Sequence, residues 1–362
     1  MFKVYVLYTG GTIGSAGTPL APVSGPDFQA LAGSMPGLAD GRVTGQPVSY
    51  RMDWFERTLD SSDMGPPDWF AIAGRLLEHY ADYDGFVVLH GTDTMGYTAS
   101  ALSFLLPGLS KPVIVTGSQV PLSVTPNDAL ANLTGAILLA GTQAIPECCV
   151  YFDSRLMRGN RAVKVSTNQF AAFASPNLPN LATVGIGVTV NRALVRPAPD
   201  PSVSLSVPAN LQALRARLAE QARAAEGFSV VLLTLYPGIR PGTVEAMLAG
   251  TQPPVAGVVI QAYGAGNGPS GADFLEVLSR ADARGIVLMD NTQALTGAVD
   301  SGAYATGLAR AGTVGAQDMT PAASFAKLVA LFSRGLAPEE VKRLMGTDLA
   351  GELTVPVDPL LL

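Results

Sequence analysis

The sequence has little of what disulfide-rich and zinc-dependent proteins require. Its only two cysteines, Cys148 and Cys149, are adjacent and therefore cannot link distant segments, which excludes a disulfide framework. It has only two histidines, His79 and His90, and neither lies at a spacing from the cysteines that would form a zinc site. The chain therefore lacks the ligands of the common zinc hydrolases.

Charge and long apolar runs are also scarce. Charged residues make up 14% of the chain, and 23 Lys+Arg against 29 Asp+Glu give a net charge of −6, which argues against a nucleic-acid partner. No stretch approaches the roughly 18 consecutive apolar residues of a membrane span. Residues 1–14 lack the apolar core of a secretory signal. We expect a cytoplasmic protein with no nucleic-acid and no membrane partner.

Hydrophobic residues, in contrast, make up 48% of the 362 positions, which excludes disorder and favours two packed domains. Short β-branched runs alternate with longer amphipathic or alanine-rich runs, a pattern that indicates strand–helix–strand units and a mostly parallel sheet. In the first half of the chain we expect strands at 4–8, 85–89, 113–116 and 149–152, and helices at 67–80, 96–105 and 127–140.

Four prolines within residues 196–208 favour an extended connector over a packed element. We therefore expect an α/β protein of two domains. A larger N-terminal domain, 1–196, holds a mostly parallel sheet flanked by helices, and a smaller C-terminal α/β domain occupies 227–362. A linker and a helix at 210–226 fill residues 197–226. The second domain is expected to contain strands at 229–235, 255–261 and 285–290 and a helix at 270–284.

A glycine-rich loop, Thr-Gly-Gly-Thr-Ile-Gly at 9–14, follows the first expected strand. In open α/β sheets, ligands bind outside the carboxyl ends of the strands. The loop has neither the lysine of a P-loop nor the glycine spacing of a dinucleotide fingerprint, which argues against nucleotide binding. It does offer the hydroxyl of Thr12. That threonine is either a functional group or an ordinary turn or cap residue, and the segment alone leaves both readings open.

A second polar loop, His-Gly-Thr-Asp-Thr-Met at 90–95, follows the expected strand 85–89. Thr92 supplies a hydroxyl and Asp93 a carboxylate, although either could instead cap the next helix. A Ser-His-Asp triad would need His90, and the chain has no Gly-x-Ser-x-Gly elbow to go with it. A threonine nucleophile would then need another base. Lys164 is available for that role, with a plain surface lysine as the alternative.

Two further loops carry weaker signals. Asp-Ser-Ser-Asp-Met at 60–64 precedes a proline-started helix, and from these residues alone a capping role is favoured over a binding role. Tyr-Gly-Ala-Gly-Asn-Gly at 263–268 lies between an expected strand and helix, but its third glycine comes too early for a dinucleotide site.

The loops 9–14 and 90–95 together resemble the paired signatures of the bacterial L-asparaginase family, in the cytoplasmic type I branch. The resemblance covers nearly the whole chain. Other segments that match in family order are 60–64, Thr-Gly-Ser-Gln at 116–119, Arg-Gly-Asn-Arg at 158–161, Phe-Ala-Ser-Pro-Asn-Leu-Pro at 173–179, 263–267 and Gly-Glu-Leu-Thr at 351–354. It implies hydrolysis of L-asparagine to L-aspartate and ammonia, with no metal and no organic cofactor.

The resemblance also implies roles for the reacting residues. Thr12 matches the threonine that attacks the side-chain amide to give an acyl-enzyme. Thr92, Lys164 and Asp93 match an inner Thr-Lys-Asp triad. Which threonine attacks first stays open. Backbone N–H groups at the glycine-rich strand ends could stabilise the oxyanion that develops.

Substrate binding is implied at several further positions. Gly11 belongs to the loop of Thr12, Asp93 is expected to hold the substrate α-ammonium, and Ser61 and Ser62 match the loop that receives the α-carboxylate. Ser118 matches a residue whose backbone is expected to face the substrate amide. Asn267 matches an asparagine that, in the family, the partner subunit contributes to the site. A homodimer or a dimer of dimers is therefore expected.

The chain departs from the family pattern at two places. The family carries an activating tyrosine shortly after the first threonine, whereas here no tyrosine occurs between Tyr8 and Tyr50, and Leu20 stands at the matching position. We expect the loop to close by apolar contact and turnover to be slower than in relatives with the tyrosine. Gln261 and Ala294 replace an arginine and a cysteine of an activating asparagine site, so we expect no activation by asparagine.

Two alternatives accompany the asparaginase interpretation. One is the ammonia-releasing subunit of an archaeal-type tRNA amidotransferase, which normally carries an additional N-terminal domain. The other is a sensor that binds asparagine or aspartate with weak or no turnover, an interpretation supported only by the missing tyrosine. Preference for asparagine or glutamine cannot be derived from the sequence, because one methylene is worth only about 1–3 kcal/mol.

Overall fold

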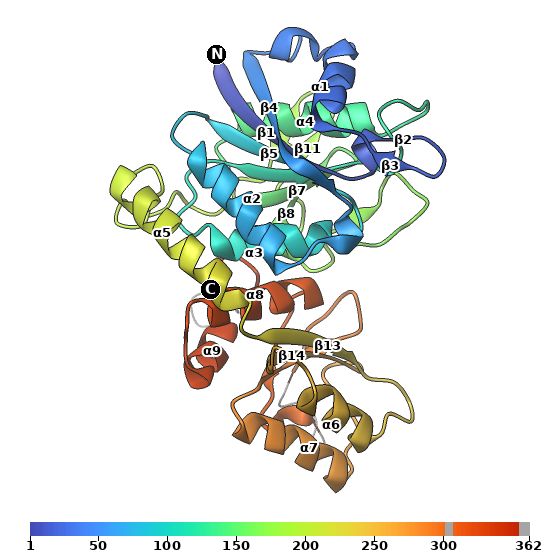
Figure 1. The fold of residues 1–362 in the computed structure, drawn as a ribbon, viewed down its shortest axis with the longest axis vertical. Helices are drawn as coiled ribbons and strands as arrows, with labels where there is room; N and C mark the ends of the chain where they lie inside the picture. Colours follow the sequence, from blue (N-terminus) through green and yellow to red (C-terminus); the bar gives the residue numbers. More distant parts are fainter. Residues whose placement is uncertain (301–306, 355–362) are drawn as a thin grey trace. The chain divides into compact units, whose positions relative to one another are not determined.

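The computed structural model describes residues 1–300 and 307–354. The chain forms two compact units, the first Met1–Leu218 and the second beginning at Ala219. This division lies inside the segment 197–226 that we expected to connect the domains. Figure 1 shows the helices and strands of each unit.

The first unit contains an eight-stranded sheet in the order β12-β11-β8-β7-β6-β5-β1-β4. The strands from β7 to β4 in this order are parallel, and β8, β11 and β12 are joined to them in antiparallel fashion. Their bounds are β1 Phe2–Gly10, β4 Val48–Leu59, β5 Gly85–Leu89, β6 Val113–Thr116, β7 Cys148–Phe152, β8 Arg155–Arg158, β11 Ala182–Val184 and β12 Val188–Val190. The central strands are buried throughout, as expected for a sheet covered on both faces.

Helices cover both faces of this sheet. Tyr8 of β1 stacks on Phe28 of α1 (Gly25–Ser34) at 4.4 Å between ring centroids, on the side where α4 (Ala129–Thr142) also packs. Tyr5 points to the other face, as expected three residues away in a strand, and stacks at 4.4 Å on His79, just after α2 (Pro66–Glu78). The helix α3 (Met95–Leu105) contacts α2. A mostly parallel sheet between two layers of helices confirms the expected α/β fold class.

The helix α5 (Pro208–Ala225) buries Leu211, Leu214 and Leu218, the three leucines at helical spacing. Arg215, also in α5, donates to the backbone oxygen of Leu77 in α2. The proline-rich segment before α5 has no regular helix or strand, as expected. It nevertheless packs, because Leu205 is buried and donates its N–H to the oxygen of Gly108.

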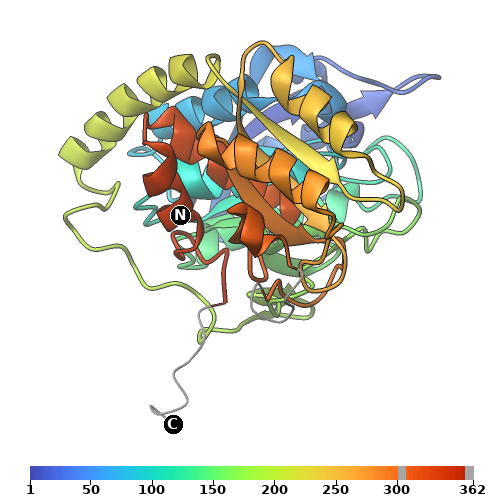
Figure 2. The same cartoon turned by 90° about the horizontal axis from the view of Figure 1, so that it is seen from below.

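The second unit contains a four-stranded parallel sheet, β13-β14-β15-β16. One apolar cluster unites it with α6 and α7, and another packs α8 and α9 against its other face. Figures 1 and 2 show α6 and α7 side by side. The bounds are β13 Ser229–Thr234, α6 Pro241–Ala249, β14 Val255–Ala262, α7 Ala272–Ala283, β15 Val287–Thr292, β16 Val314–Gly315, α8 Pro321–Ser333 and α9 Pro338–Met345.

The strands and helices expected from the sequence are all present, with ends displaced by a few residues. The structure adds elements that the hydrophobic pattern did not predict, among them α1, β4, β8, β11 and β12. In the described ranges, no helix is both long and apolar enough to cross a membrane.

Candidate active site

Three loops at the carboxyl edge of the first sheet lie in direct contact because glycines line their meeting point. A Cβ atom on Gly11, whose φ is +86°, would lie only 2.4 Å from the backbone nitrogen of Gly91. A Cβ on Gly91 would lie 2.4 Å from Oγ of Ser61. Only glycine allows such close approach. The loops that follow β1, β4 and β5 are thereby brought together, and each carries a residue expected in the site.

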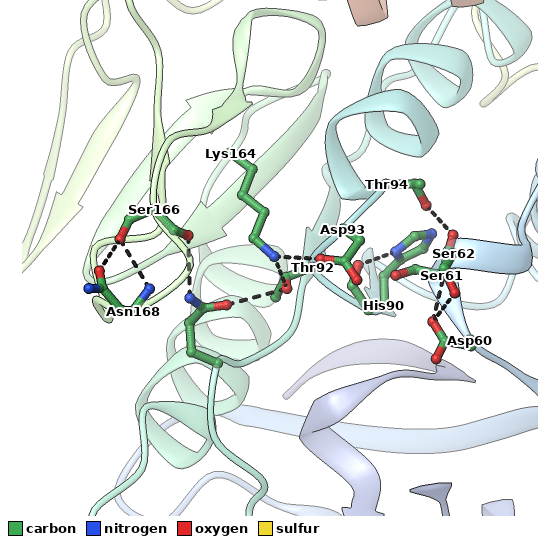
Figure 3. Close-up of polar contacts among 12 residues, drawn as sticks. Asp60, Ser61, Ser62, His90, Thr92, Asp93, Thr94, Lys164, Ser166 and Asn168 are labelled. Carbon is green, nitrogen blue, oxygen red and sulfur yellow. Dashed lines mark hydrogen bonds and ion pairs between the residues drawn. The ribbon is translucent and has the colours of Figure 1, made fainter. Parts of the chain in front are cut away.

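Thr92, Asp93 and Lys164 form a hydrogen-bonded cluster (Figure 3). Lys164 belongs to the short strand β9 (Val163–Lys164), and its Nζ donates to Oγ1 of Thr92 at 2.8 Å and to Oδ1 of Asp93 at 2.6 Å. The Lys164 side chain is 20% exposed, whereas that of Asp93 is 64% exposed. Lys164 is therefore not a plain surface lysine, and Asp93 keeps an oxygen open to solvent or to a cationic ligand.

Neither Thr92 nor Asp93 caps the following helix. The N-cap of α3 is Thr94, which makes no side-chain cap bond; its hydroxyl donates instead to the oxygen of Ser61 at 2.7 Å. The side chains of Thr92 and Asp93 are directed to Lys164. Their capping alternative is thus wrong in this structure.

Thr12 opens the short 3-10 helix η1 (Thr12–Gly14) directly after Gly11. Gly11 is the N-cap residue, so Thr12 does not cap this helix. The threonine is half-buried, next to the contact between Gly11 and Gly91. This contact places the loop of Thr12 against the loop of Thr92.

The serines of the 60–64 loop differ from each other. Asp60 caps the 3-10 helix η3 (Ser61–Asp63) by accepting from both N and Oγ of Ser62 at 2.9 Å. The proline-started helix α2 is capped by Gly65 instead, so loop 60–64 does not cap it as the sequence predicted. Ser62 is exposed, and its hydroxyl is engaged within this turn. Ser61 is buried beside Gly91. Of the two, Ser61 is the one that the structure brings to the Thr92 loop.

Ser118 and Asn267 complete the expected set. Ser118 is buried after β6, and its hydroxyl donates to the oxygen of Val120 at 2.6 Å. Asn267 belongs to the second unit, where its backbone pairs with Tyr263 in a tight turn, with both N···O distances 2.8 Å. All the expected residues except Asn267 therefore belong to the first unit.

His90 is buried in this region but is not available as a base. Its Nδ1 lies 2.6 Å from the oxygen of Gly91, and its Nε2 lies 2.8 Å from Oγ1 of Thr98. Because a carbonyl only accepts, Nδ1 carries the proton and Nε2 accepts from Thr98. Burial lowers the pKa of His90 to about 4. The neutral ring is fully used in structural bonds, so Lys164 is the base candidate beside Thr92.

Gln119 and Asp128 contribute to this region, although sequence reasoning assigned them no role. Oγ1 of Thr92 donates to Oε1 of Gln119 at 3.3 Å. The carboxylate of Asp128 accepts the backbone N–H of Gln119 and of Val120, with N···O distances of 3.0–3.1 Å. The position of Gln119, directly after Ser118 at a strand end, was the available signal.

Leu20 lies in the turn of a small hairpin formed by β2 (Ser15–Ala16) and β3 (Ala21–Pro22), which follows η1. Its side chain is 55% exposed. At the base of the hairpin, the hydroxyl of Tyr8 donates to the oxygen of Val23 at 3.2 Å. The segment that lacks the family tyrosine is therefore an ordered hairpin with an apolar, exposed tip.

Across residues 1–300 and 307–354, no group of His, Cys, Asp and Glu is arranged to hold a metal ion. The groups that the region offers are hydroxyls, one amine, carboxylates and the backbone N–H groups of glycine-rich loops. Such a set can perform nucleophilic acyl transfer, with the lysine and backbone dipoles supporting the charge changes.

The fold and this cluster define an α/β protein of two units with a threonine–lysine–aspartate cluster at the carboxyl edge of its first sheet. Residues 3–196 match the family described as "Asparaginase, N-terminal", and residues 229–345 match "Glutaminase/Asparaginase C-terminal domain". The chain belongs to the asparaginase family.

Individual relatives agree with this assignment. The chain is 42% identical to "L-asparaginase 1" of Escherichia coli strain K12, over 97% of this chain and 98% of that protein. It is also 42% identical to the "60 kDa lysophospholipase" of Mus musculus, over 99% of this chain but only 64% of that longer protein. The crystal structure of L-asparaginase I from Vibrio cholerae superposes with a TM-score of 0.82 at 37% identity, covering 98% of this chain and 99% of that one.

Proposed function

We propose that the chain is an L-asparaginase that hydrolyses L-asparagine to L-aspartate and ammonia. The observation that supports this most directly is the cluster of Thr92, Asp93 and Lys164, packed against the loop that carries Thr12. Family membership and the likeness to proteins named L-asparaginase support the same reaction.

In the proposed reaction, the hydroxyl oxygen of Thr12 attacks the side-chain amide carbon of the substrate. The hydroxyl proton leaves to a base, and the C–N bond then breaks as the nitrogen takes up a proton and departs as ammonia. Water cleaves the resulting ester and regenerates the threonine. Backbone N–H groups of the glycine-rich loops stabilise the oxyanion in both steps.

Thr92, Lys164 and Asp93 support this chemistry. Lys164 in its amine form accepts a proton through Thr92, while Asp93 stabilises the ammonium that results. The exposed oxygen of Asp93 holds the α-ammonium of the substrate, and the buried Ser61 provides a polar group for its α-carboxylate.

The finer assignments belong to the same proposal. We expect Gly11, Ser62 and the backbone of Ser118 to contact the substrate and Asn267 to act in a homodimer or a dimer of dimers. We also expect a cytoplasmic location. These expectations come from the family resemblance.

The proposal is tested by measuring ammonia release from L-asparagine by the purified protein and by its Thr12→Ala and Thr92→Ala variants. Each variant is expected to lose at least about 1,000-fold in kcat, because a nucleophile or its proton relay is removed. Thr183→Ala, an exposed threonine on β11, is the matched control and is expected to retain full activity.

Two further substrates complete the assay. L-glutamine tests the pocket's tolerance for one methylene, and a lysophospholipid tests the activity named for the mouse relative. Binding of asparagine without ammonia release by the intact protein would support the sensor alternative instead. Fatty-acid release that exceeds ammonia release would reassign the substrate class.

A further inference from the structure

Gln119 occupies a central position in the candidate site. It follows β6 and the buried Ser118, and its side-chain amide is bonded at both ends. The Nε2 atom lies 3.4 Å from the oxygen of Ser166 and 3.3 Å from the oxygen of Gln169. Both are backbone carbonyls of the loop that follows Lys164. The oxygen end, Oε1, lies 3.3 Å from Oγ1 of Thr92.

These contacts fix the orientation of the amide. Carbonyl oxygens only accept hydrogen bonds, so the NH₂ group must face Ser166 and Gln169, and the oxygen must face Thr92. The Thr92 hydroxyl therefore lies between a donor, Nζ of Lys164 at 2.8 Å, and an acceptor, Oε1 of Gln119. In this arrangement its proton points to Gln119.

The backbone beneath Gln119 is fixed as well. The buried carboxylate of Asp128, at the start of α4, accepts the N–H groups of Gln119 and Val120. Asn132 donates to the oxygen of Gly117 at 3.0 Å and to the same carboxylate at 3.2 Å. Asp128 and Asn132, at the N-terminus of α4, thus hold the backbone of residues 117–120, from which the Gln119 amide extends to Thr92.

We propose that Gln119 is a positioning residue that sets the direction of the Thr92 hydroxyl and ties it to the loop after Lys164. This inference rests on the proposed function. For Thr92 to pass its proton to Lys164, the O–H bond must turn from Oε1 of Gln119 to the amine, where the O–H bond breaks and an N–H bond forms. Before this rotation, the bond from Thr92 to Oε1 of Gln119 keeps the hydroxyl oxygen at bonding distance from the amine.

Two substitutions separate this role from simple packing. Gln119→Met keeps the length of the side chain but removes the acceptor, and kcat is expected to fall at least about tenfold while KM changes less than about twofold. Gln119→Glu keeps an acceptor and adds a negative charge near Lys164, which already pairs with Asp93. It is expected to shift the acid limb of the kcat–pH profile upward by about one unit, because the charge stabilises the ammonium. Gln169→Ala is the control, since only the backbone oxygen of Gln169 takes part.

A second readout does not depend on turnover. The pH dependence of Lys164 acetylation by acetic anhydride, followed by peptide mass spectrometry, reports the amine form directly. Gln119→Glu is expected to raise the midpoint by about one unit, and Gln169→Ala to leave it unchanged. A wild-type protein that releases no ammonia would sink the proposed function alone, because the labelling still tests Gln119. Unchanged labelling in Gln119→Glu, or full kcat in Gln119→Met, would overturn the role of Gln119.

Discussion

Two buried carboxylates in the second unit show how much a partner matters to a single residue. Glu352 is fully buried, pairs with Lys327 at 2.5 Å and accepts the backbone N–H groups of Leu349 and Ala350. Asp290 is 1% exposed, and both of its oxygens lack a hydrogen-bond partner within the described ranges. A Cβ on Gly266 would lie 2.8 Å from its Oδ2, so the turn at 263–267 packs directly on the carboxylate. Such a charge is costly to bury.

Asp290 is expected to make the protein less stable as pH rises. Burial raises the pKa of Asp290 to about 7 from an ordinary value of 3.8. Between pH 3.8 and about 7, the folded state therefore binds more protons at Asp290 than the unfolded state does. The resulting gain in the free energy of unfolding is complete below about pH 4 and is lost as pH rises through 7. Three pKa units correspond to about 4 kcal/mol.

Asp290→Asn, which stays neutral, is expected to raise Tm relative to wild type at pH 8 by several degrees more than at pH 5, as measured by thermal melts in matched buffers. Glu352→Gln serves as a contrast because it breaks the bond to Lys327 and is expected to lower Tm at both pH values. An Asp290→Asn effect that is equal at the two pH values would contradict the argument.

At the scale of elements, the buried core could be predicted and the periphery could not. The strand at 85–89 is an uninterrupted apolar run between turn residues, and the structure has β5 at Gly85–Leu89. By contrast, β4 lies at the edge of the sheet, is only partly buried and contains Arg51, Glu56 and Arg57, so it has no continuous apolar signal. Edge strands are shaped by the neighbour they pair with more than by their own pattern.

The candidate site shows the same division. The paired threonine loops were found because polar residues at strand ends have no packing explanation. The role of Gln119 could not be found in this way, because its bonds to Thr92 and to Ser166 join residues 27 and 47 positions away. The place of Gln119 near a strand end can be read from the sequence, but these partners cannot, because the order of the strands brings them together.

The β2–β3 hairpin provides a test at this scale. Its exposed Leu20 stands where the family resemblance places an activating tyrosine. If the missing phenol limits turnover, Leu20→Tyr is expected to raise kcat for ammonia release at least about tenfold, since a positioned acid–base group contributes on the order of 100-fold or more. Leu20→Phe, which adds the ring without the hydroxyl, is expected to give no such gain. Equal kcat values for the wild type, Leu20→Tyr and Leu20→Phe would mean that another group accepts the proton of Thr12.

At the scale of the whole molecule, the residues expected in the site belong to both units of the chain, which makes the proposed role of Asn267 in a partner subunit testable. The first unit carries Thr12, Thr92 and Lys164, and the second carries Asn267. If Asn267 completes the site of a partner subunit, Thr12→Ala and Asn267→Ala proteins must complement each other. A mixed dimer then contains one site with both substitutions and one site with neither.

Co-expression of the two variants under different affinity tags, followed by sequential purification on both, isolates the mixed dimer. It is expected to show about half of the wild-type ammonia release, because one of two sites is intact. Each variant alone is expected to be strongly impaired. If Asn267 acts within its own chain, every subunit of the mixed dimer carries one defect, and the activity stays at the average of the two variants. The size of the recovery therefore decides between a site built within one chain and a site shared by two.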